Sequence, residues 1–330
     1  NTKIYTGTGS SNALTGVGFQ PDWTWIKRRN ATASHAIQDA VRGNDKSLRS
    51  NTTGAEYTNT FFSSFDTDGF TVTSSESDVN ASAETYASWN WKANGSGSSN
   101  TDGTTSSTVS VNTTAGFSIV KWTGSGSATT IGHGLGVTPK IIMLKNTSEV
   151  YGWQVYHASL GNTKYLALDS TDAQATSSQS WNNTSPTSTV FSVGASDSNN
   201  KSGNTIIAYC FAEKKGFSKF GSYVGNGSTW GTFVNCGFKP AWIMLKDTNS
   251  GSAGWMMFDN KRLGYNVDNN ALYPNATAAE GTGDDVDLLS NGFKARSTDA
   301  GINTSGNSYI YMCFAEEPIV SSNGVPAVAR

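Results

Sequence analysis

The sequence is poor in charged residues, and the few that it has nearly cancel. Only 15% of its 330 residues are charged, and the formal net charge is −2. Proteins that bind the nucleic-acid backbone need an excess of cationic side chains, so we expect no nucleic-acid partner. No run of 18 apolar residues occurs either, so we expect no membrane insertion.

Cysteine is also scarce, which excludes a disulfide-stapled fold. The three cysteines are Cys210, Cys236 and Cys313. Cys210 and Cys313 occupy the same position in two copies of the repeat described below. Equivalent positions of separate domains lie too far apart for a bridge, whose Cα atoms must approach within about 7 Å. We therefore expect three free thiols, which suits a chain assembled in a reducing cytoplasm.

The common catalytic and metal motifs are missing. The sequence has no Gly-x-Ser-x-Gly, His-Glu-x-x-His or Cys-x-x-Cys segment. Its Gly-x-Gly segments lack the third glycine and the following helix of a nucleotide-binding loop, and we interpret them as hairpin turns. No amphipathic helix pattern is present. We expect no enzymatic activity and no cofactor.

What the sequence does contain is a long repeat. A Gly-Phe-x-Pro-type turn followed by an apolar strand that ends in lysine occurs at 18–27, 136–145 and 237–246. The copies lie too far apart for a solenoid, whose units run about 20–50 residues, and each is large enough to bury its own core. Aromatic residues reach 11%, with 10 Trp, so the chain is not a disordered one.

Short strands and turn signals fill each copy and predict an all-β fold of three tandem β-sandwich, jelly-roll-like domains. Asp68-Gly69 and Asn291-Gly292 predict hairpins. The closing strands at 85–91, 205–211 and 308–314 are apolar on both faces, which indicates central strands. We place the domains at 1–95, 114–215 and 216–318, followed by a tail at 319–330. Residues 96–113 are rich in Gly, Ser and Thr and predict a flexible linker about which the first domain hinges.

An Asp-x-x-Arg pair occurs in the first and third copies, as Asp39 with Arg42 and Asp259 with Arg262. An acid poised by a cation can serve catalysis, but the same pair can also pin a loop. The second copy has lost both partners and keeps the rest of the pattern. We therefore favour the structural interpretation.

A few residues outside the strand pattern are candidates for binding. Aromatic faces stack on sugar rings and amides bind hydroxyl groups, so a set of loop residues could hold a glycan. The alternative is that these rings cover the ends of the sandwiches or fill subunit contacts. The candidates are Trp181, Asn182, Trp230, Tyr265 and Asp268, with Tyr273 beside them.

An acidic segment near the C-terminus is a weak calcium candidate. Asp284, Asp285 and Asp287 lie in a glycine-bearing stretch, and carboxylates in such a turn suit a hard cation. The spacing is not that of the known twelve-residue calcium loop. We favour a solvated turn over a calcium loop and assign no metal site.

The repeated motifs resemble those of the tandem-repeat structural proteins that marine bacteriophages encode, the tail-fibre and other virion proteins. The segments that carry the resemblance lie at 18–27, 39–43, 64–72, 133–139, 217–223 and 289–294. They span nearly the whole chain. The first copy departs from the pattern at His35 and Asn90. The resemblance implies a virion location and offers no catalytic residue.

From these features we expect a phage virion surface protein of the tail-fibre type, which attaches to a host-surface glycan or receptor. It would be assembled in the host cytoplasm and contact itself, as a homo-oligomer, and other virion proteins. One alternative is a purely structural or decorating protein of the capsid or tail. Another is a glycan-degrading tail spike. Since the chain starts at Asn1 in a strand-like segment without a signal peptide, we also expect a missing N-terminal part.

Overall fold

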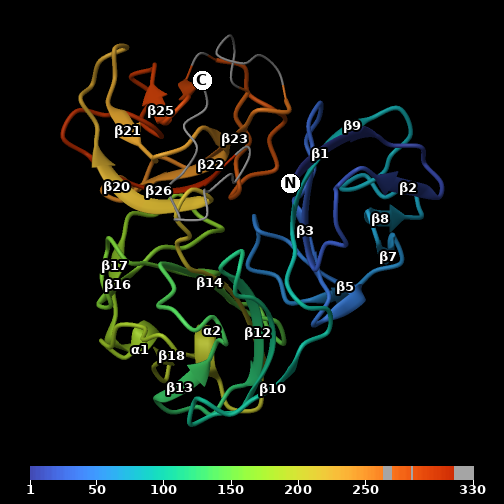
Figure 1. The fold of residues 1–330 in the computed structure, drawn as a ribbon, viewed down its shortest axis with the longest axis vertical. Helices are drawn as coiled ribbons and strands as arrows, with labels where there is room; N and C mark the ends of the chain where they lie inside the picture. The colour runs from blue at the N-terminus through green and yellow to red at the C-terminus, as the bar shows by residue number, and fades with distance from the viewer. Residues whose placement is uncertain (263–269, 284, 316–330) are drawn as a thin grey trace. The chain divides into compact units, whose positions relative to one another are not determined.

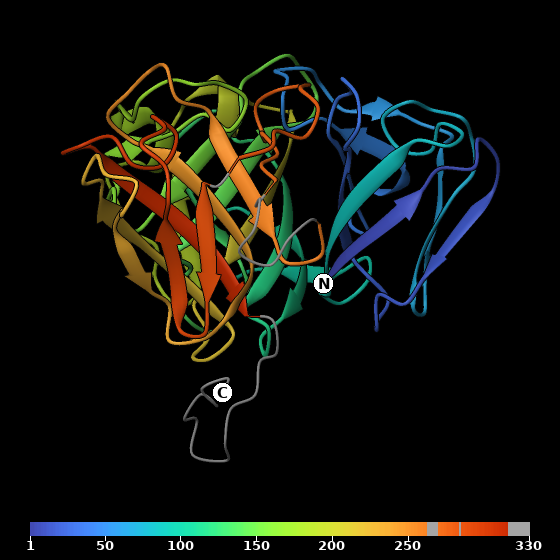
Figure 2. The ribbon, with the colours of Figure 1, turned by 90° about the horizontal axis from the view of Figure 1, so that it is seen from above.

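The computed structural model describes residues 1–262, 270–283 and 285–315, and these residues are nearly all β, as predicted. Their helices are two four-residue segments, α1 (Ser178–Trp181) and α2 (Asp197–Asn200). None of these described helices has the length and apolar character to cross a membrane. The chain divides into two compact units, one of residues 1–169 with 175–212, the other of residues 170–174 with the chain from Glu213 onward. Figures 1 and 2 show the strands of each repeat in successive colours.

The first repeat is a sandwich of two antiparallel sheets, which can be followed in blue to cyan in Figure 1. Its core joins Leu14 and Phe70 of the smaller sheet to Ile26 and Tyr86 of the larger one. The larger sheet has the order β1 (Thr2–Thr6), β9 (Thr85–Trp91), β3 (Trp23–Arg28), β4 (Ala36–Asp39), β5 (Gly43–Leu48) and β6 (Tyr57–Thr58). The smaller sheet has the order β2 (Asn12–Thr15), β8 (Gly69–Val72) and β7 (Phe62–Asp66).

The second repeat keeps the same central strands and adds two at one edge. Its larger sheet has the order β10 (Ser98–Asn100), β11 (Ser107–Asn112), β12 (Phe117–Thr123), β19 (Thr205–Phe211), β14 (Ile141–Asn146) and β15 (Gln154–His157). Two short sheets accompany it, β13 (Thr129–Gly132) with β18 (Val190–Val193), and β16 (Lys164–Tyr165) with β17 (Ala175–Thr176).

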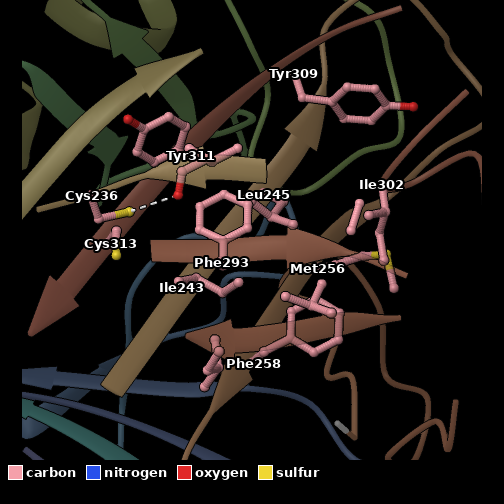
Figure 3. Packing of buried hydrophobic residues seen from close by; sticks show 14 of the residues in the cluster. Cys236, Ile243, Leu245, Met256, Phe258, Phe293, Ile302, Tyr309, Tyr311 and Cys313 are labelled. Carbon is pink, nitrogen blue, oxygen red and sulfur yellow. Dashed lines mark hydrogen bonds between the residues drawn. The ribbon is translucent and has the colours of Figure 1, made fainter. Parts of the chain in front are cut away.

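The third repeat has the same plan, and its core is shown in Figure 3. The larger sheet has the order β20 (Ser218–Val224), β26 (Ser308–Ala315), β22 (Pro240–Asp247) and β23 (Trp255–Asp259). The smaller sheet has the order β21 (Phe233–Asn235), β25 (Gly292–Ala295) and β24 (Val286–Leu289). Cys236 and Cys313 both lie in this core, and all three cysteines are free, as predicted.

The strands predicted after the Gly-Phe-x-Pro-type turns and at the end of each repeat are confirmed. The strand after each Gly-Phe-x-Pro-type turn is β3, β14 or β22, and the closing strands β9, β19 and β26 each pair on both edges. The Asp68-Gly69 and Asn291-Gly292 signals form the hairpins β7–β8 and β24–β25. The predicted tail at 319–330 lies outside the described residues.

The stretch 96–113 is not a flexible linker, and this correction has a local cause. β10 and β11 lie inside it, and β11 pairs with β12 over its full length. Serine and threonine set the composition of the stretch, but alternating Val109 and Val111 give it a strand pattern. Val109 is buried in the core of the second repeat, and Val111 packs against that core.

The hinge expected after the first repeat is also absent, since the first two repeats belong to one compact unit. Trp23 of β3 stacks on Tyr209 of β19, with 4.6 Å between ring centroids, and on Phe117 of β12. The Tyr209 hydroxyl donates to Asp39 at 2.7 Å, and the indole N–H of Trp153 donates to the Arg49 carbonyl at 2.9 Å. The outer apolar faces of the two large sheets therefore cover each other, which explains why the closing strands β9 and β19 are apolar on both sides.

The Gly-x-Gly segments do not make hairpins, which corrects a second expectation. In each repeat the chain leaves the larger sheet before this segment and enters a smaller sheet after it. A Cβ on the first glycine, Gly7, Gly124 or Gly225, would lie 2.1–2.2 Å from a backbone carbonyl oxygen. The second glycine has a φ of +67° to +73°. The glycines thus allow the chain to make the tight turn that carries it from one sheet to the other.

One buried asparagine locks this passage in every repeat. Asn80, Asn200 and Asn303 are each fully buried. In the third repeat the Asn303 carbonyl oxygen accepts from the Asn226 backbone N–H at 2.9 Å, and its amide donates to the Ser228 carbonyl at 2.7 Å and the Ser297 carbonyl at 3.1 Å. The other two asparagines make the same kinds of bond. A single side chain thus joins the loop to two further segments.

A buried lysine ends each Gly-Phe-x-Pro-type strand. Lys27, Lys145 and Lys246 are fully buried, and each ammonium donates to the carbonyl of the residue that follows it, at 2.6–2.8 Å. Lys246 also donates to the carbonyls of Thr171 and Ala253, at 3.0 and 2.9 Å. These bonds tie the strand ends to neighbouring loops.

We predict that Asn303→Ala lowers the free energy of unfolding by about 2–4 kcal/mol, because several buried backbone groups lose their partner. Urea unfolding of the full chain measures this change. Ser305→Ala, at an exposed turn position of the same repeat, is the control. Equal unfolding midpoints for the two variants would contradict the role assigned to Asn303.

The pH dependence of the free energy of unfolding tests how strongly burial affects Lys145. Burial lowers the pKa of Lys145 from 10.5 to about 8. Between these values the unfolded chain binds more protons than the folded one, so the free energy of unfolding should rise with pH, by up to about 3 kcal/mol. Below pH 8 both states carry the proton and the contribution stays constant.

The measurement is the difference in free energy of unfolding between the wild type and Lys145→Met across this pH range. The exposed Lys92→Met variant serves as its control. A Lys145→Met difference that stays as flat as that of Lys92→Met would refute the prediction.

Candidate functional site

Trp230 is the most exposed large apolar side chain of the described residues. It lies in the loop between β20 and β21, and 69% of its surface is accessible. Burying an indole contributes strongly to stability, so a tryptophan left in solvent needs another reason to be there. Exposed apolar residues mark a binding surface when they form a contiguous patch, and Phe233 of the neighbouring β21 is also 44% exposed.

The loop that carries Trp230 is longer than its counterparts in the other repeats. Leu14, Ile131 and Val234 are equivalent, because each pairs with a buried phenylalanine of the neighbouring strand. From the second glycine of the Gly-x-Gly segment to this residue, the first two repeats advance five positions (9 to 14 and 126 to 131). The third repeat advances seven (227 to 234). Trp230 therefore belongs to an insertion that the common framework does not require.

The inserted loop is held at several points. Asn303 fixes Asn226 and Ser228 through the buried amide described above. The Ser228 hydroxyl accepts from the Trp230 backbone N–H at 3.1 Å, and the Asn226 amide donates to the Trp230 carbonyl at 3.2 Å. The next residue, Gly231, donates to the Ala295 carbonyl at 3.1 Å. The indole is thus presented to solvent on a constrained backbone.

Two cations of β25 and its extension lie against the indole. Lys294 Nζ lies 3.3 Å from the ring centroid, and the Arg296 guanidinium carbon lies 4.9 Å from it. Such cation–π contacts contribute about 0.5–1 kcal/mol at exposed sites and fix the ring orientation. Arg296 Nε also lies 3.5 Å from the Asp287 carboxylate. The site therefore combines an exposed ring with two positive charges and one negative charge.

The third repeat departs from the other two at the two cations that contact this ring and at two exposed apolar positions of β20 and β21. Lys294 replaces Thr71 and Ser192, the residues that follow the equivalent buried phenylalanines. Arg296 occupies the position that Thr73 has in the first repeat and Gly194 has in the second. Phe233 and Val224, which are 44% and 56% exposed, replace alanine or threonine. We define the Trp230 site as the five residues Val224, Trp230, Phe233, Lys294 and Arg296.

Two other aromatic candidates do not belong to this site. Trp181 was expected on a loop, but it ends α1, is 1% exposed and packs in the core of the second repeat, edge-on against Tyr156. Asn182 next to it is exposed and takes a left-handed backbone conformation as the C-cap of that helix. Tyr273 is partly buried and packs on the core of the third repeat.

The remaining candidates give no support for a second site. Tyr265, Asp268 and Asp284 lie outside the described residues. The Asp287 carboxylate is paired with Arg296, and the Asp285 backbone carbonyl accepts from the Arg296 N–H at 2.8 Å. Within the described parts of the chain, no group of three His, Cys, Asp or Glu side chains could hold a metal ion.

The Asp-x-x-Arg pairs are structural, as favoured from the sequence. Arg262 Nε lies 2.7 Å from Asp259, and its other nitrogens donate to Glu280 at 3.0 Å and to the Met257 carbonyl at 3.1 Å. Both members of the pair are buried, and Asp259 also accepts two backbone N–H groups.

The pair in the first repeat has the same bonds, with Asp39, Arg42 and Glu56 in these places. Burial alone would lower the pKa of Arg42, but the charges of Asp39 and Glu56 hold that pKa above its ordinary value. The Arg42 guanidinium therefore stays charged, and both arginines are used in buried ion pairs.

Sequence reasoning identified Trp230 and missed its neighbours. Lys294 and Arg296 are more than sixty positions away in the chain, and neither stands out by composition. A position-by-position comparison of the three repeats does contain the signal, since charged residues replace small ones at equivalent strand positions only in the third copy.

Comparison with known proteins gives a family and no activity. The chain matches the family model of a domain of unknown function, DUF7483, over residues 1–318. This match covers all three repeats as one unit. No curated protein matches the chain.

Trp230 is exposed and Trp181 is buried, so replacing each with alanine should lower the free energy of unfolding by very different amounts. Trp230→Ala should lower the free energy of unfolding by about 1 kcal/mol, because only its exposed cation–π contacts are lost. Trp181→Ala should cost about 3–5 kcal/mol, because it leaves a cavity in the core. Urea unfolding of both variants checks this, and a large loss in Trp230→Ala would show that the ring is part of the framework.

Proposed function

We propose that this chain, which belongs to the DUF7483 family, is a bacteriophage virion surface protein of the tail-fibre type that attaches to a host-surface glycan through the Trp230 site. The observation that carries the binding part is the inserted, backbone-held and largely exposed Trp230. The motif resemblance to phage tail-fibre and other virion proteins supports the placement on the particle.

The chemistry of the site fits a saccharide. Sugar rings present flat C–H faces that stack on an indole, and their hydroxyl groups take hydrogen bonds from nearby polar side chains. Phe233 lies beside Lys294 in the β21–β25 pairing and widens the apolar surface around the ring. A rigid loop loses little entropy when it binds, so even a small contact area gives useful affinity.

We propose that attachment, and no reaction, is the task of this surface. The Asp-x-x-Arg acids are buried and bonded to arginine and backbone groups, which leaves them unsuited to reach a substrate. The five residues of the Trp230 site include no carboxylate, and the neighbouring Asp287 is paired with Arg296. A glycan-cleaving site usually needs two carboxyl groups on either side of one bond.

A single weak site per chain becomes effective when chains assemble. We propose a homo-oligomer within the virion, since closed symmetric assembly is common and linked weak sites gain avidity. Contacts with other virion proteins would anchor it. The three free, buried thiols are compatible with assembly in the host cytoplasm.

Binding of the purified full chain to a glycan array tests this proposal. We expect binding that is lost in Trp230→Ala and retained in Tyr151→Ala. Tyr151 is the matched control because it also has a cation near its ring, Lys201 at 5.7 Å, but lies in the second repeat.

The outcomes separate the proposal from its rivals. Absence of binding to the array and to host cells would overturn the attachment role. If Trp230→Ala instead changes the oligomeric state in sedimentation, the ring is a subunit contact and the chain is a structural protein. Shortening of host polysaccharide on incubation with the protein would identify a tail spike.

A further inference from the structure

We infer that Cys236 and Cys313 form a latent disulfide site, in which a two-electron oxidant such as a peroxide joins the two thiols across the core of the third repeat. The inference concerns a covalent modification and does not depend on the proposed function. It is based on the contact between the two thiols, on their places in the two sheets, and on the equivalent positions of the other repeats.

The two thiols meet inside the third repeat. Both residues belong to its buried core cluster, and both cysteines are free. The Cys313 thiol hydrogen-bonds to the Cys236 thiol, and Figure 3 shows the two side chains next to each other. The Cys236 thiol in turn donates to the Val234 carbonyl at 3.9 Å. Thiols in such contact have only to rotate and close the remaining gap to the S–S bond length of about 2.0 Å.

A bond between these residues would connect the two sheets of the third repeat. Cys313 lies in β26, the closing strand inside the larger sheet, where it pairs with Ile243 of β22. Cys236 directly follows β21 of the smaller sheet. The bridge would therefore hold one sheet on the other and close a loop of 77 positions, from 236 to 313. Closing a long loop restricts the unfolded chain, so the bridge should stabilise the folded repeat.

The fold does not require a thiol at either position, as the other repeats show. Neither of them has cysteine at both places, although each builds the same kind of large sheet. The equivalent pairs, matched by strand register, are Gly16 with Asn90 in the first repeat and His133 with Cys210 in the second. Only the third repeat thus brings two thiols together, which indicates a role for the pair itself.

The oxidation balances with hydrogen peroxide as the oxidant. Cys236 reacts first, because it is 6% exposed while Cys313 is fully buried. Its sulfur attacks one peroxide oxygen, the O–O bond breaks, and the departing hydroxide takes the thiol proton and leaves as water. The Cys313 sulfur then displaces the hydroxyl group of the sulfenic acid, which forms the S–S bond and releases a second water with the Cys313 proton. The two thiols together lose two electrons and two protons.

Burial also keeps the pair reduced until an oxidant is in excess. It raises the pKa of the Cys313 thiol well above its ordinary value, and the hydrogen bond to Cys236 acts in the same direction. Because the thiolate is the reactive form, oxidation of the folded chain should be slow. The thiols therefore persist in a reducing compartment, and the bridge forms after the chain reaches an oxidising one.

The test treats the folded full chain with a small excess of hydrogen peroxide. Free thiols are then counted by alkylation after denaturation, and bridged peptides are mapped by mass spectrometry. We expect the count to fall from three to one, with Cys236 linked to Cys313, and dithiothreitol to restore all three thiols. The oxidised chain should unfold at a urea midpoint higher by about 1 M.

The third cysteine provides the matched control. Cys210 is buried like the other two, so Cys210→Ala should still lose two thiols to the bridge, whereas Cys236→Ala should form none. The same treatment of the urea-unfolded chain separates contact in the fold from closeness along the sequence. There Cys210 and Cys236, which are 26 positions apart, should bridge most readily because they close the shortest loop.

The peptide map of the wild type decides the inference, whether or not a variant folds. A folded chain that keeps three thiols, or that links the same pair as the unfolded chain, rejects the disulfide site. A bridge between Cys236 and Cys313 that leaves the urea midpoint unchanged or lowers it rejects the assigned role of joining the two sheets. Neither result bears on glycan attachment, which the array tests separately.

Discussion

The fold of each repeat depends on how the chain passes from its large sheet to a small one, and a buried asparagine fixes that passage. The side-chain amide of Asn303, like those of Asn80 and Asn200, hydrogen-bonds to three backbone groups. It accepts from one N–H group and donates to two carbonyl oxygens. A buried amide with all of its partners is strongly stabilising, whereas backbone groups that lose it are costly. The glycines on either side add close approach and a left-handed backbone. Together they make a corner that tolerates few changes.

The proposed binding surface is built directly on this corner. Asn303 hydrogen-bonds to the backbone of Asn226 and Ser228. The side chains of these two residues in turn hydrogen-bond to the Trp230 backbone. The insertion therefore gains rigidity from a framework that all three repeats share. Only the outward-facing residues differ, with lysine, arginine and phenylalanine in place of small side chains. With this division, one repeat can carry the proposed binding site while the others keep the same fold.

Sequence alone was sufficient for features that rest on local chemistry. Asp68-Gly69 and Asn291-Gly292 specify hairpins because their backbone preferences act within four residues. The apolar closing strands are central because both of their faces must be covered. By contrast, the Gly-x-Gly segments fix a bend but not the sheet that the next strand joins. The linker prediction relied on average composition and overlooked the alternation of Val109 and Val111.

The candidate site was only partly predictable for a similar reason. Trp181 and Trp230 look alike in the sequence, each beside small polar residues, yet one is buried and the other exposed. The difference arises from helix α1, which turns Trp181 onto Tyr156. Lys294 and Arg296 come next to Trp230 through strand pairing between distant segments.

Because β10 and β11 pair with the second repeat, they limit where the chain can be cut to produce soluble fragments. A cut near residue 96 would separate the first two repeats at the point where composition suggests a boundary. It would also uncover the aromatic faces of both large sheets, with Trp23, Tyr209 and Phe117 exposed to water. Such fragments would associate through these faces or precipitate. The first two repeats are thus best expressed as a single piece.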